Sequence, residues 1–241
     1  MTTDPFASLT AVGLNLHAVM DLSRLPSPVV ATLGLTEAEK PRWRQLILLG
    51  NMGTSAWDAL QARGMHGSDP LDTWVTERVT AWMQGPLAGH HWRLVFPGPT
   101  AVGLQALGQL AGWHHPSPFW VGVDAHWGSW FAYRAVVLAD TDLPLTPRRE
   151  LASPCLTCDG QPCVSACPAE ALKRVDEGTV HGTAAGDLGA CMSFRLRAAS
   201  PCQDRCLARQ ACPVGEAHRY GEAQMAYHYL QSLPALRRWA A

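Results

Sequence analysis

The residues most able to do chemistry in this chain are its eight cysteines, all of which lie in the C-terminal part of the sequence. Two of them are followed directly by proline, and each Cys-Pro closes a run of closely spaced thiols. Thiolate sulfur is the ligand that iron-sulfur clusters prefer, with four cysteines for each [4Fe–4S] cluster. The pattern therefore predicts two such clusters. The cysteines are Cys155, Cys158, Cys163, Cys167, Cys191, Cys202, Cys206 and Cys212.

The order of the cysteines also predicts which of them hold each cluster. In bacterial two-cluster ferredoxins, the Cys before Pro of one run ligates the cluster of the other run. Applied to this sequence, the crossing exchanges Cys167 and Cys212 between the two runs. One cluster is then held by Cys155, Cys158, Cys163 and Cys212, and the other by Cys167, Cys191, Cys202 and Cys206.

Other interpretations of the cysteines are a zinc site, a disulfide framework, or buried thiols without a ligand. Zinc accounts for one quartet but rarely for eight cysteines with two Cys-Pro closures, so the clusters are favoured. The intervals are longer than in the usual ferredoxin run, because Asp159–Pro162 puts four residues before Cys163. Such an insertion can bulge outward without moving the sulfurs, or it can leave one cluster altered or lost.

Length and composition predict two domains. The chain has 241 residues, of which 47% are hydrophobic, and a cysteine-free portion precedes the cysteine-rich one. We place the boundary in the polar segment 140–154, which gives domains 1–148 and 149–241. The formal net charge of −1 argues against nucleic acid as a partner. The sequence shows no secretory signal and no apolar run of membrane-spanning length, so we expect a cytoplasmic location without a membrane partner.

The first domain shows alternating strand and helix patterns, which predict an α/β sandwich rather than a barrel. The expected strands cover residues 12–20, 45–49, 92–96, 119–123 and 130–139. The expected helices follow a capping box at Thr36, a glycine turn at 50–55, Pro70 and Thr100. In the second domain, a helix is expected over 216–239, interrupted near Pro234.

Two further stretches are candidate binding sites. Gly50 and Gly53 lie in a turn between a strand and a helix, where free backbone N–H groups could bind an anion such as a cofactor phosphate; the alternative is a plain tight connection. A loop region rich in histidine and aromatic residues is typical of a pocket for a flat or apolar ligand, with histidine supplying a proton or a metal bond. The alternative is hydrogen-bonded structure. The candidates in this region are Trp113, His114, His115, His126, Trp127 and Ser129.

The segments 106–113, 128–131 and 191–195, together with the cysteine runs, resemble epoxyqueuosine reductases over roughly residues 90–215. These enzymes, and the related reductive dehalogenases, carry a nitroreductase-like cobalamin-binding domain fused to a ferredoxin domain with two [4Fe–4S] clusters. The resemblance implies this fold, the same crossed ligand assignment, and a corrinoid as an additional cofactor. It also implies that electrons pass one at a time from the clusters to the corrinoid.

The chain departs from the family at two positions. Gly112–Ser117 stands where the family has a Gly-Lys-Asn motif, and Val95–Pro99 lacks the acid that donates a proton to the substrate. His114 and His115 are then the candidate proton donors. The family's longer members also have a helical-repeat tail that grips transfer RNA, and this sequence lacks it. We therefore do not predict tRNA modification.

The sequence thus predicts an iron-sulfur redox protein. It would receive electrons from a redox partner protein and transfer them to a corrinoid, or to a small-molecule substrate, in the N-terminal domain. The alternative is a non-catalytic protein that binds or processes cobalamin, or senses redox state, with clusters that are structural.

Overall fold

The chain forms two compact units in a computed structural model that describes residues 4–176 and 186–240. The first, here called the sheet unit, comprises Met1–Ala111 and Phe131–Arg149. The second, the cysteine unit, comprises Gly112–Trp130 and Glu150–Ala241. The chain therefore crosses from one unit to the other after Ala111, after Trp130 and after Arg149. The last of these crossings lies in the segment 140–154, where the sequence predicts a boundary.

The sheet unit is built on an antiparallel sheet whose strands, within the described residues, have the order β1-β2-β4-β3. The two central strands are buried along most of their length, as expected when both faces of a sheet are covered. Antiparallel pairing joins every neighbouring pair, so the predicted strand-helix alternation does not produce a parallel sheet. The strands are β1 (Leu16–Asp21), β2 (Gln45–Met52), β3 (Trp92–Phe96) and β4 (Phe131–Ala139).

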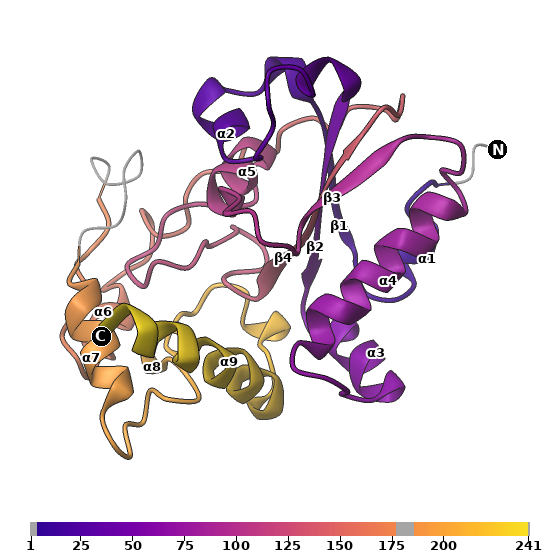
Figure 1. Ribbon diagram of the computed structural model, residues 1–241. Coiled ribbons are helices and arrows are strands. Elements are labelled where there is room, and N and C mark those ends of the chain that lie inside the picture. Colours follow the sequence, from indigo (N-terminus) through magenta and orange to yellow (C-terminus); the bar gives the residue numbers. More distant parts are fainter. Residues whose placement is uncertain (1–3, 177–185, 241) are drawn as a thin grey trace. The chain divides into compact units, whose positions relative to one another are not determined.

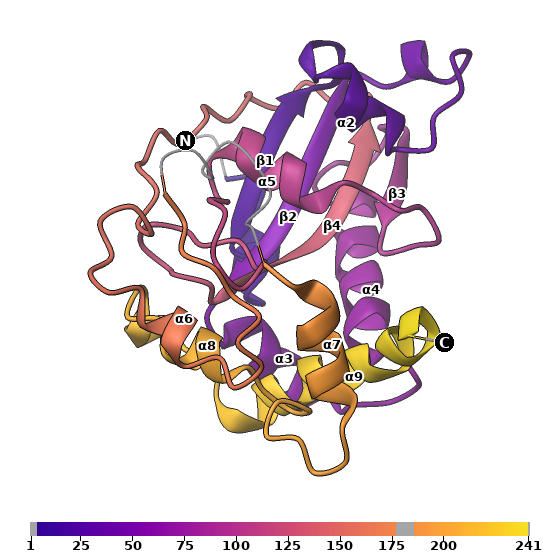
Figure 2. The same ribbon diagram turned by 90° about the vertical axis from the view of Figure 1, so that its left-hand side faces the viewer.

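Helices cover both faces of this sheet. Figures 1 and 2 show α1, α3 and α4 on one face and α2 and α5 on the other. The predicted amphipathic pattern of α4 is confirmed, because Leu71, Trp74 and Val75, with other residues at helical spacing, are buried. The helices are α1 (Ala7–Thr10), α2 (Ser27–Ala31), α3 (Ser55–Arg63), α4 (Pro70–Gln84) and α5 (Leu104–Ala111), with 3₁₀ turns at Leu22–Arg24 and Lys40–Arg42.

One glycine sets how closely α5 approaches the sheet. A Cβ on Gly108 would lie 1.9 Å from the hydroxyl oxygen of Tyr133 on β4, well inside contact distance. The ring of Tyr133 therefore occupies the space that a side chain on α5 would need. Burial raises the pKa of Tyr133, so the phenol stays protonated.

Several expected elements differ from the structure. The strand expected over 119–123 is wrong: these residues form a loop in which Val123 pairs with His115 as an isolated antiparallel bridge. The expected first strand begins later, at Leu16, because Gly13 adopts a φ of +84° in a turn. Only half of the capping box forms: the Glu39 carboxylate accepts from the backbone N–H and the hydroxyl of Thr36, while the Glu39 N–H donates to the Thr36 carbonyl. A turn and the Lys40–Arg42 3₁₀ helix follow.

The cysteine unit contains the short helices α6, α7 and α8 and the long helix α9, joined by loops (Figure 1). Helix α6 contacts α8, and α7 contacts α9. Helix α9 continues through Pro234, so the predicted interruption is wrong. It also begins later than expected, because Gly215, with a φ of +69°, starts a separate 3₁₀ turn over Glu216–His218. The helices are α6 (Pro162–Ser165), α7 (Leu188–Leu196), α8 (Leu207–Gln210) and α9 (Glu222–Ala240).

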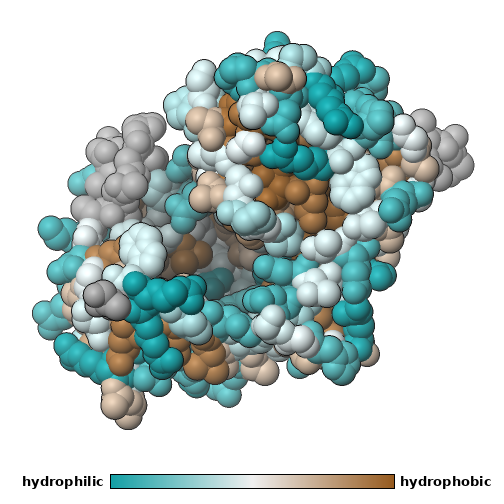
Figure 3. Space-filling view, viewed as in Figure 1, coloured by the Kyte–Doolittle hydropathy of each residue, from teal (hydrophilic) through white to brown (hydrophobic). Residues whose placement is uncertain are grey.

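Hydrophilic side chains cover most of the face seen in Figure 3, and hydrophobic residues appear there in separate patches. Large exposed hydrophobic residues do occur, and Trp239, at 80% exposure, is the most accessible of them among the described residues. None of the helices in the described part of the chain is long and apolar enough to span a membrane.

Candidate metal centre

All eight cysteines lie in the cysteine unit, and each is a free thiol. Cys155, Cys163, Cys202 and Cys212 are buried, and the other four are half-buried. Burial of so many thiols without disulfide pairing leaves metal ligation or simple packing as their roles. The neighbours of each thiol distinguish between these two.

Four of the thiols interact with one another. Burial raises the pKa of Cys155 to about 12, and Cys212, Cys163 and Cys158 add to the rise through their charges. Burial likewise raises the pKa of Cys163 to about 11, with contributions from Cys212 and Cys158. Like charges disfavour ionisation of one another only at short range, so these side chains lie close together. This group, here called the first quartet, consists of Cys155, Cys158, Cys163 and Cys212.

The other four thiols form a second group. Burial raises the pKa of Cys191 to about 11, and Cys206, Cys167 and Cys202 contribute through their charges. All four line one cavity of about 310 Å³ in the cysteine unit. The rest of its lining is largely apolar and includes Phe119, Leu172 and Tyr229. This group, here called the second quartet, consists of Cys167, Cys191, Cys202 and Cys206.

The unusual insertion before Cys163 is held in place by Gln161. This buried residue has a φ of +41°, in the left-handed region. Its amide nitrogen donates to the carbonyl oxygens of Cys155 and Val175 at 3.2 and 2.7 Å, and its amide oxygen accepts the Val175 N–H at 2.9 Å. The insertion is therefore a fixed loop that leads directly into α6, which carries Cys163.

Backbone N–H groups surround several of the sulfurs. The Arg209 N–H donates to the sulfur of Cys206 at 3.4 Å, so that this thiol caps helix α8. Backbone N–H groups of Leu207 and Val214 also reach the sulfurs of Cys202 and Cys212. Bonds from N–H to sulfur favour the thiolate over the thiol and tune the potential of iron-sulfur clusters.

Neither quartet is gathered tightly around one point. Within residues 4–176 and 186–240, no group of three or more His, Cys, Asp or Glu side chains is placed to hold a single metal ion. Ligands of a single zinc ion lie about 2.3 Å from it and so stay close to one another. The four thiolates of a [4Fe–4S] cube bind four separate iron atoms and are spread more widely.

Trp113, His114 and His115 lie in the cysteine unit, at the start of its first segment. Trp113 and His114 are buried, and His115 pairs through its backbone with Val123. The His114 ring packs against Gly122, where an added Cβ would lie 2.2 Å from its Nδ1 atom. Burial, and then the neighbouring His115, lower the pKa of His114 to about 4. His114 is therefore neutral near pH 7, which leaves His115 as the better candidate proton donor.

His126, Trp127 and Ser129 lie near the other end of the same segment. His126 is exposed, and its ring lies 5.4 Å from that of His218. Backbone N–H groups of His126 and Trp127 donate to Asp124 Oδ1 at 2.7 and 3.0 Å. Ser129 is completely buried, and its hydroxyl accepts a hydrogen bond from Arg209. These contacts give the segment a fixed shape.

The candidate glycines Gly50 and Gly53 lie in the sheet unit. Gly50 belongs to β2, where it pairs with Leu16 and Tyr133. Gly53 lies in the following turn with a φ of +65°, and an added Cβ there would meet no atom within 4 Å. Gly53 thus supplies a left-handed turn residue between β2 and α3.

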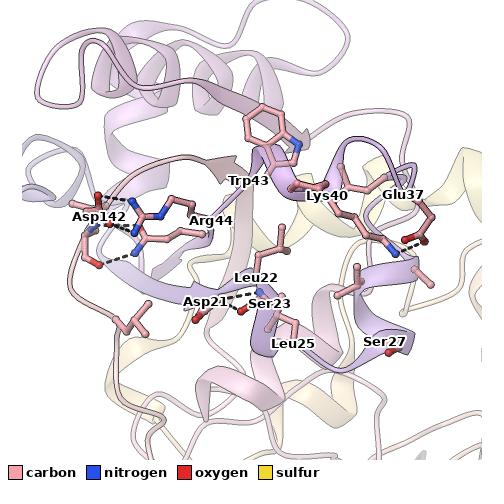
Figure 4. A pocket seen from close by; sticks show the side chains of 17 residues that line it. Asp21, Leu22, Ser23, Leu25, Ser27, Glu37, Lys40, Trp43, Arg44 and Asp142 are labelled. Atoms are coloured by element: carbon pink, nitrogen blue, oxygen red, sulfur yellow. Dashed lines mark hydrogen bonds and ion pairs between the residues drawn. The ribbon is translucent and has the colours of Figure 1, made fainter.

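The sequence did not predict a cavity of about 1160 Å³ in the sheet unit (Figure 4). Its charged side chains are paired with one another: Arg44 with Asp142 at 2.5 Å, and Lys40 with Glu37. Asp21 accepts hydrogen bonds from the backbone and hydroxyl of Ser23. All the charged groups of these pairs are more than a third exposed, so the pairs are typical of a solvated rim.

Sequence reasoning also missed three arginines beside the quartets: Arg195, Arg209 and Arg219. The Arg195 side chain donates to the carbonyl of Cys202, and that of Arg219 to the carbonyl of Cys212. Arg209 donates its backbone N–H to the sulfur of Cys206, and its side chain lines the cavity of the second quartet. All three lie within or just after the cysteine runs, and this position could have marked them in the sequence. A cation changes the electrostatic energy of any anionic thiolate that lies near it.

No protein-family model matches this chain, and no curated protein matches it by sequence. Solved structures do share its fold. An epoxyqueuosine reductase from Bacillus subtilis has a TM-score of 0.55 at 9% identity, covering 90% of this chain and 66% of its own length. An epoxyqueuosine reductase with an epoxyqueuosine-modified tRNA-Tyr stem loop has a TM-score of 0.56 at 12% identity, covering 92% and 67%.

A third similar structure is the B12-trafficking protein CblC from C. elegans, a homologue of human MMACHC. It has a TM-score of 0.53 at 12% identity, covering 97% of this chain and 93% of its own length. The chain thus spans about two thirds of the length of the reductases and nearly the whole of the trafficking protein. At these identities the likeness is one of fold: this chain has a mixed α/β fold similar to that of epoxyqueuosine reductases and of CblC.

Proposed function

We propose that this chain is an iron-sulfur redox protein whose cysteine unit is a ferredoxin-like domain with two [4Fe–4S] clusters. The observation that carries the proposal is the division of eight free thiols into two groups of four neighbours. Each group contains the Cys-Pro cysteine of the other run, as in bacterial two-cluster ferredoxins. In the proposal, the first quartet ligates one cluster and the second quartet the other.

The chemistry of the two sites fits clusters better than it fits zinc. Each quartet offers four sulfurs, and sulfur is the donor that iron-sulfur clusters require. The thiols of the second quartet surround a cavity of about 310 Å³, which gives room for a group larger than one ion. Burial makes the thiols resist ionisation, so that the positive charge of iron is what would stabilise them as thiolates.

We further propose that the clusters serve a corrinoid bound by the same chain. Clusters of this type carry single electrons, and a low-potential donor is needed to reduce the cobalt of a corrinoid. The fold is similar to that of epoxyqueuosine reductases and of a B12-trafficking protein, which supports this choice of cofactor. An external redox partner protein supplies the electrons. His115 is the candidate proton donor toward a substrate.

Metal analysis and cobalamin titration test this function. Protein purified without oxygen and reconstituted with iron and sulfide is expected to contain about eight irons and eight acid-labile sulfides per chain. Cob(II)alamin and a low-potential reductant are then added, and reduction of the cobalt is followed by absorption. A chain that carries zinc, or no metal and no sulfide, would rule out the proposal.

The second candidate function is non-catalytic cobalamin binding or processing, with clusters that are structural or sense redox state. It is favoured by the similarity to CblC, which this chain matches over 93% of that protein's length. The same titration separates the two functions. Binding of cobalamin without electron transfer from reduced clusters supports the second, and absence of binding removes the corrinoid from both.

A further inference from the structure

Arg209 is a buried cation that is fixed on several sides within the cysteine unit. Only 6% of its surface is exposed. Its Nε atom donates to the Ser129 hydroxyl at 3.1 Å, and an NH2 group donates to the Ser129 carbonyl. Its guanidinium carbon lies 4.7 Å from the ring centre of Trp130 and 5.1 Å from that of Tyr220. The charge is therefore held at one place with little freedom to move.

Among the described residues, this buried charge has no carboxylate partner. The Arg209 side chain contacts hydroxyls, a carbonyl and aromatic rings there. A buried arginine is normally paired with an anion, because desolvation of an unpaired charge is strongly unfavourable. The anion that balances Arg209 must then come from a group that binds nearby.

The cysteines on either side of Arg209 indicate which group that is. Arg209 lies on α8, between Cys206 of the second quartet and Cys212 of the first. It lines the same cavity as the four thiols of the second quartet. The Arg209 backbone also bonds to both cysteines: its N–H donates to the Cys206 sulfur at 3.4 Å, and its carbonyl accepts the Cys212 N–H at 3.2 Å. Arg209 therefore lies beside one cysteine of each quartet.

Two other arginines each reach one quartet only, so they are matched controls. Arg195 donates through Nε to the carbonyl of Cys202 at 3.1 Å and through NH2 to Tyr229 and Ser232 at 3.0 Å. Arg195 also lines the cavity that the four thiols of the second quartet line. Arg219 donates to the carbonyl of Cys212, of the first quartet, at 3.1 Å and is paired with Glu216.

We propose that Arg209 is a shared counter-charge that raises the reduction potentials of both [4Fe–4S] clusters together. The inference rests on the proposed function. A cluster with four thiolates is an anion, and reduction adds one more negative charge to it. A fixed cation nearby stabilises the reduced form more than the oxidised form, and the low dielectric of a buried site strengthens this effect. In this role Arg209 raises the reduction potentials of the clusters and does not ligate iron.

Redox titration of the whole chain, followed by electron paramagnetic resonance, tests the inference. In Arg209→Gln, both cluster transitions are expected to move to more negative potential. In Arg195→Gln, only the transition of the second-quartet cluster is expected to move, and in Arg219→Gln only that of the first. The transitions are assigned with Cys191→Ala and Cys163→Ala, each of which removes one cluster.

Iron content separates failure of the inference from failure of the proposed function. If the unmodified chain contains no clusters, the proposed function is wrong. If Arg209→Gln contains as much iron as the unmodified chain but shifts neither transition, or only one, the counter-charge role is wrong. If Arg209→Gln does not load clusters, Arg209→Lys decides: loading by the lysine variant supports a required charge, and its failure to load shows that Arg209 only shapes the loop.

Discussion

Cys155 and Cys212 lie close enough for the charge of one to raise the pKa of the other, in addition to the effect of burial, although they begin and end the cysteine-containing stretch. The two residues are too far apart in the sequence for local chain geometry to bring them together. The fold of the cysteine unit brings them together by packing α6 against α8, and Cys163 and Cys212 share one hydrophobic cluster there. The charges that act on Cys155 and Cys191 come from the cysteines of their own quartets, while the crossed ligation of iron remains a prediction.

Pairs of cysteine substitutions are expected to reveal the two quartets. Cys163→Ala should remove or convert one cluster, with loss of roughly half of the iron. Adding Cys212→Ala should cause little further loss, because both residues belong to the first quartet, whereas adding Cys191→Ala should remove most of the remaining iron. Iron and sulfide analysis of the anaerobically purified variants measures these losses. Equal iron in the two double variants would contradict the assignment.

Gly215→Ala is expected to weaken loading of the first quartet. Gly215 has a φ of +69°, and an added Cβ would lie 2.2 Å from the carbonyl carbon of Trp127. The opposite contact is equally tight, since a Cβ on Gly128 would lie 2.0 Å from the Val214 carbonyl oxygen. The strain would be relieved by moving the segment that follows Cys212. Gly221→Ala is the control, because its Cβ would meet no atom within 4 Å. Full iron content in Gly215→Ala would show that the close contact of Gly215 with the backbone of Trp127 is not needed for loading.

The sequence predicted the strands and helices that have strong local signals. The apolar run at 45–49 became β2, and the Asp-Pro start with periodic tryptophans became α4. The segment 119–123 has the composition of a strand, yet Phe119 and Val123 pack in the hydrophobic cluster around Cys163 and Cys212. Local pattern could not show this, because tertiary packing overrides propensity in short apolar segments.

The part of the candidate site that depends on residue type and spacing can be predicted from the sequence. Thiol spacing, with the crossing of two-cluster ferredoxins, predicts two groups of cysteines, and their ligation of clusters stays a prediction. The role of Arg209 was not visible in the same way, because its partner Ser129 lies far from it in the sequence and any arginine near a cysteine run can equally be a solvated charge. Ser129 itself was predicted as a cofactor ligand; in the structure its hydroxyl accepts a hydrogen bond from Arg209.

Gly108→Ala is expected to destabilise the sheet unit. Alanine is favoured over glycine in a helix by up to about 1 kcal/mol. Here, however, the new methyl group would overlap the Tyr133 hydroxyl and ring, and overpacking of this kind costs about 1–3 kcal/mol. Urea unfolding measures the change. In a Tyr133→Leu background, the same glycine substitution should cost less, because the ring is absent; an equal cost in both backgrounds would place the strain elsewhere.

His114 is expected to make stability depend on pH. Burial lowers its pKa to about 4 in the folded chain, whereas an unfolded histidine titrates near 6.5, so the unfolded state binds more protons between these values. Stability is therefore fully present above about pH 6.5 and falls as the pH approaches 4, with a loss of about 1 kcal/mol by pH 5.5. Urea unfolding at pH 7.5 and 5.5 measures this loss, and His114→Gln should lack that part of it. His126→Gln, which changes an exposed histidine, is the control and should keep the full loss. If His114→Gln also kept it, the ring of His114 would have to be protonated in the folded chain, which its packing against Gly122 opposes.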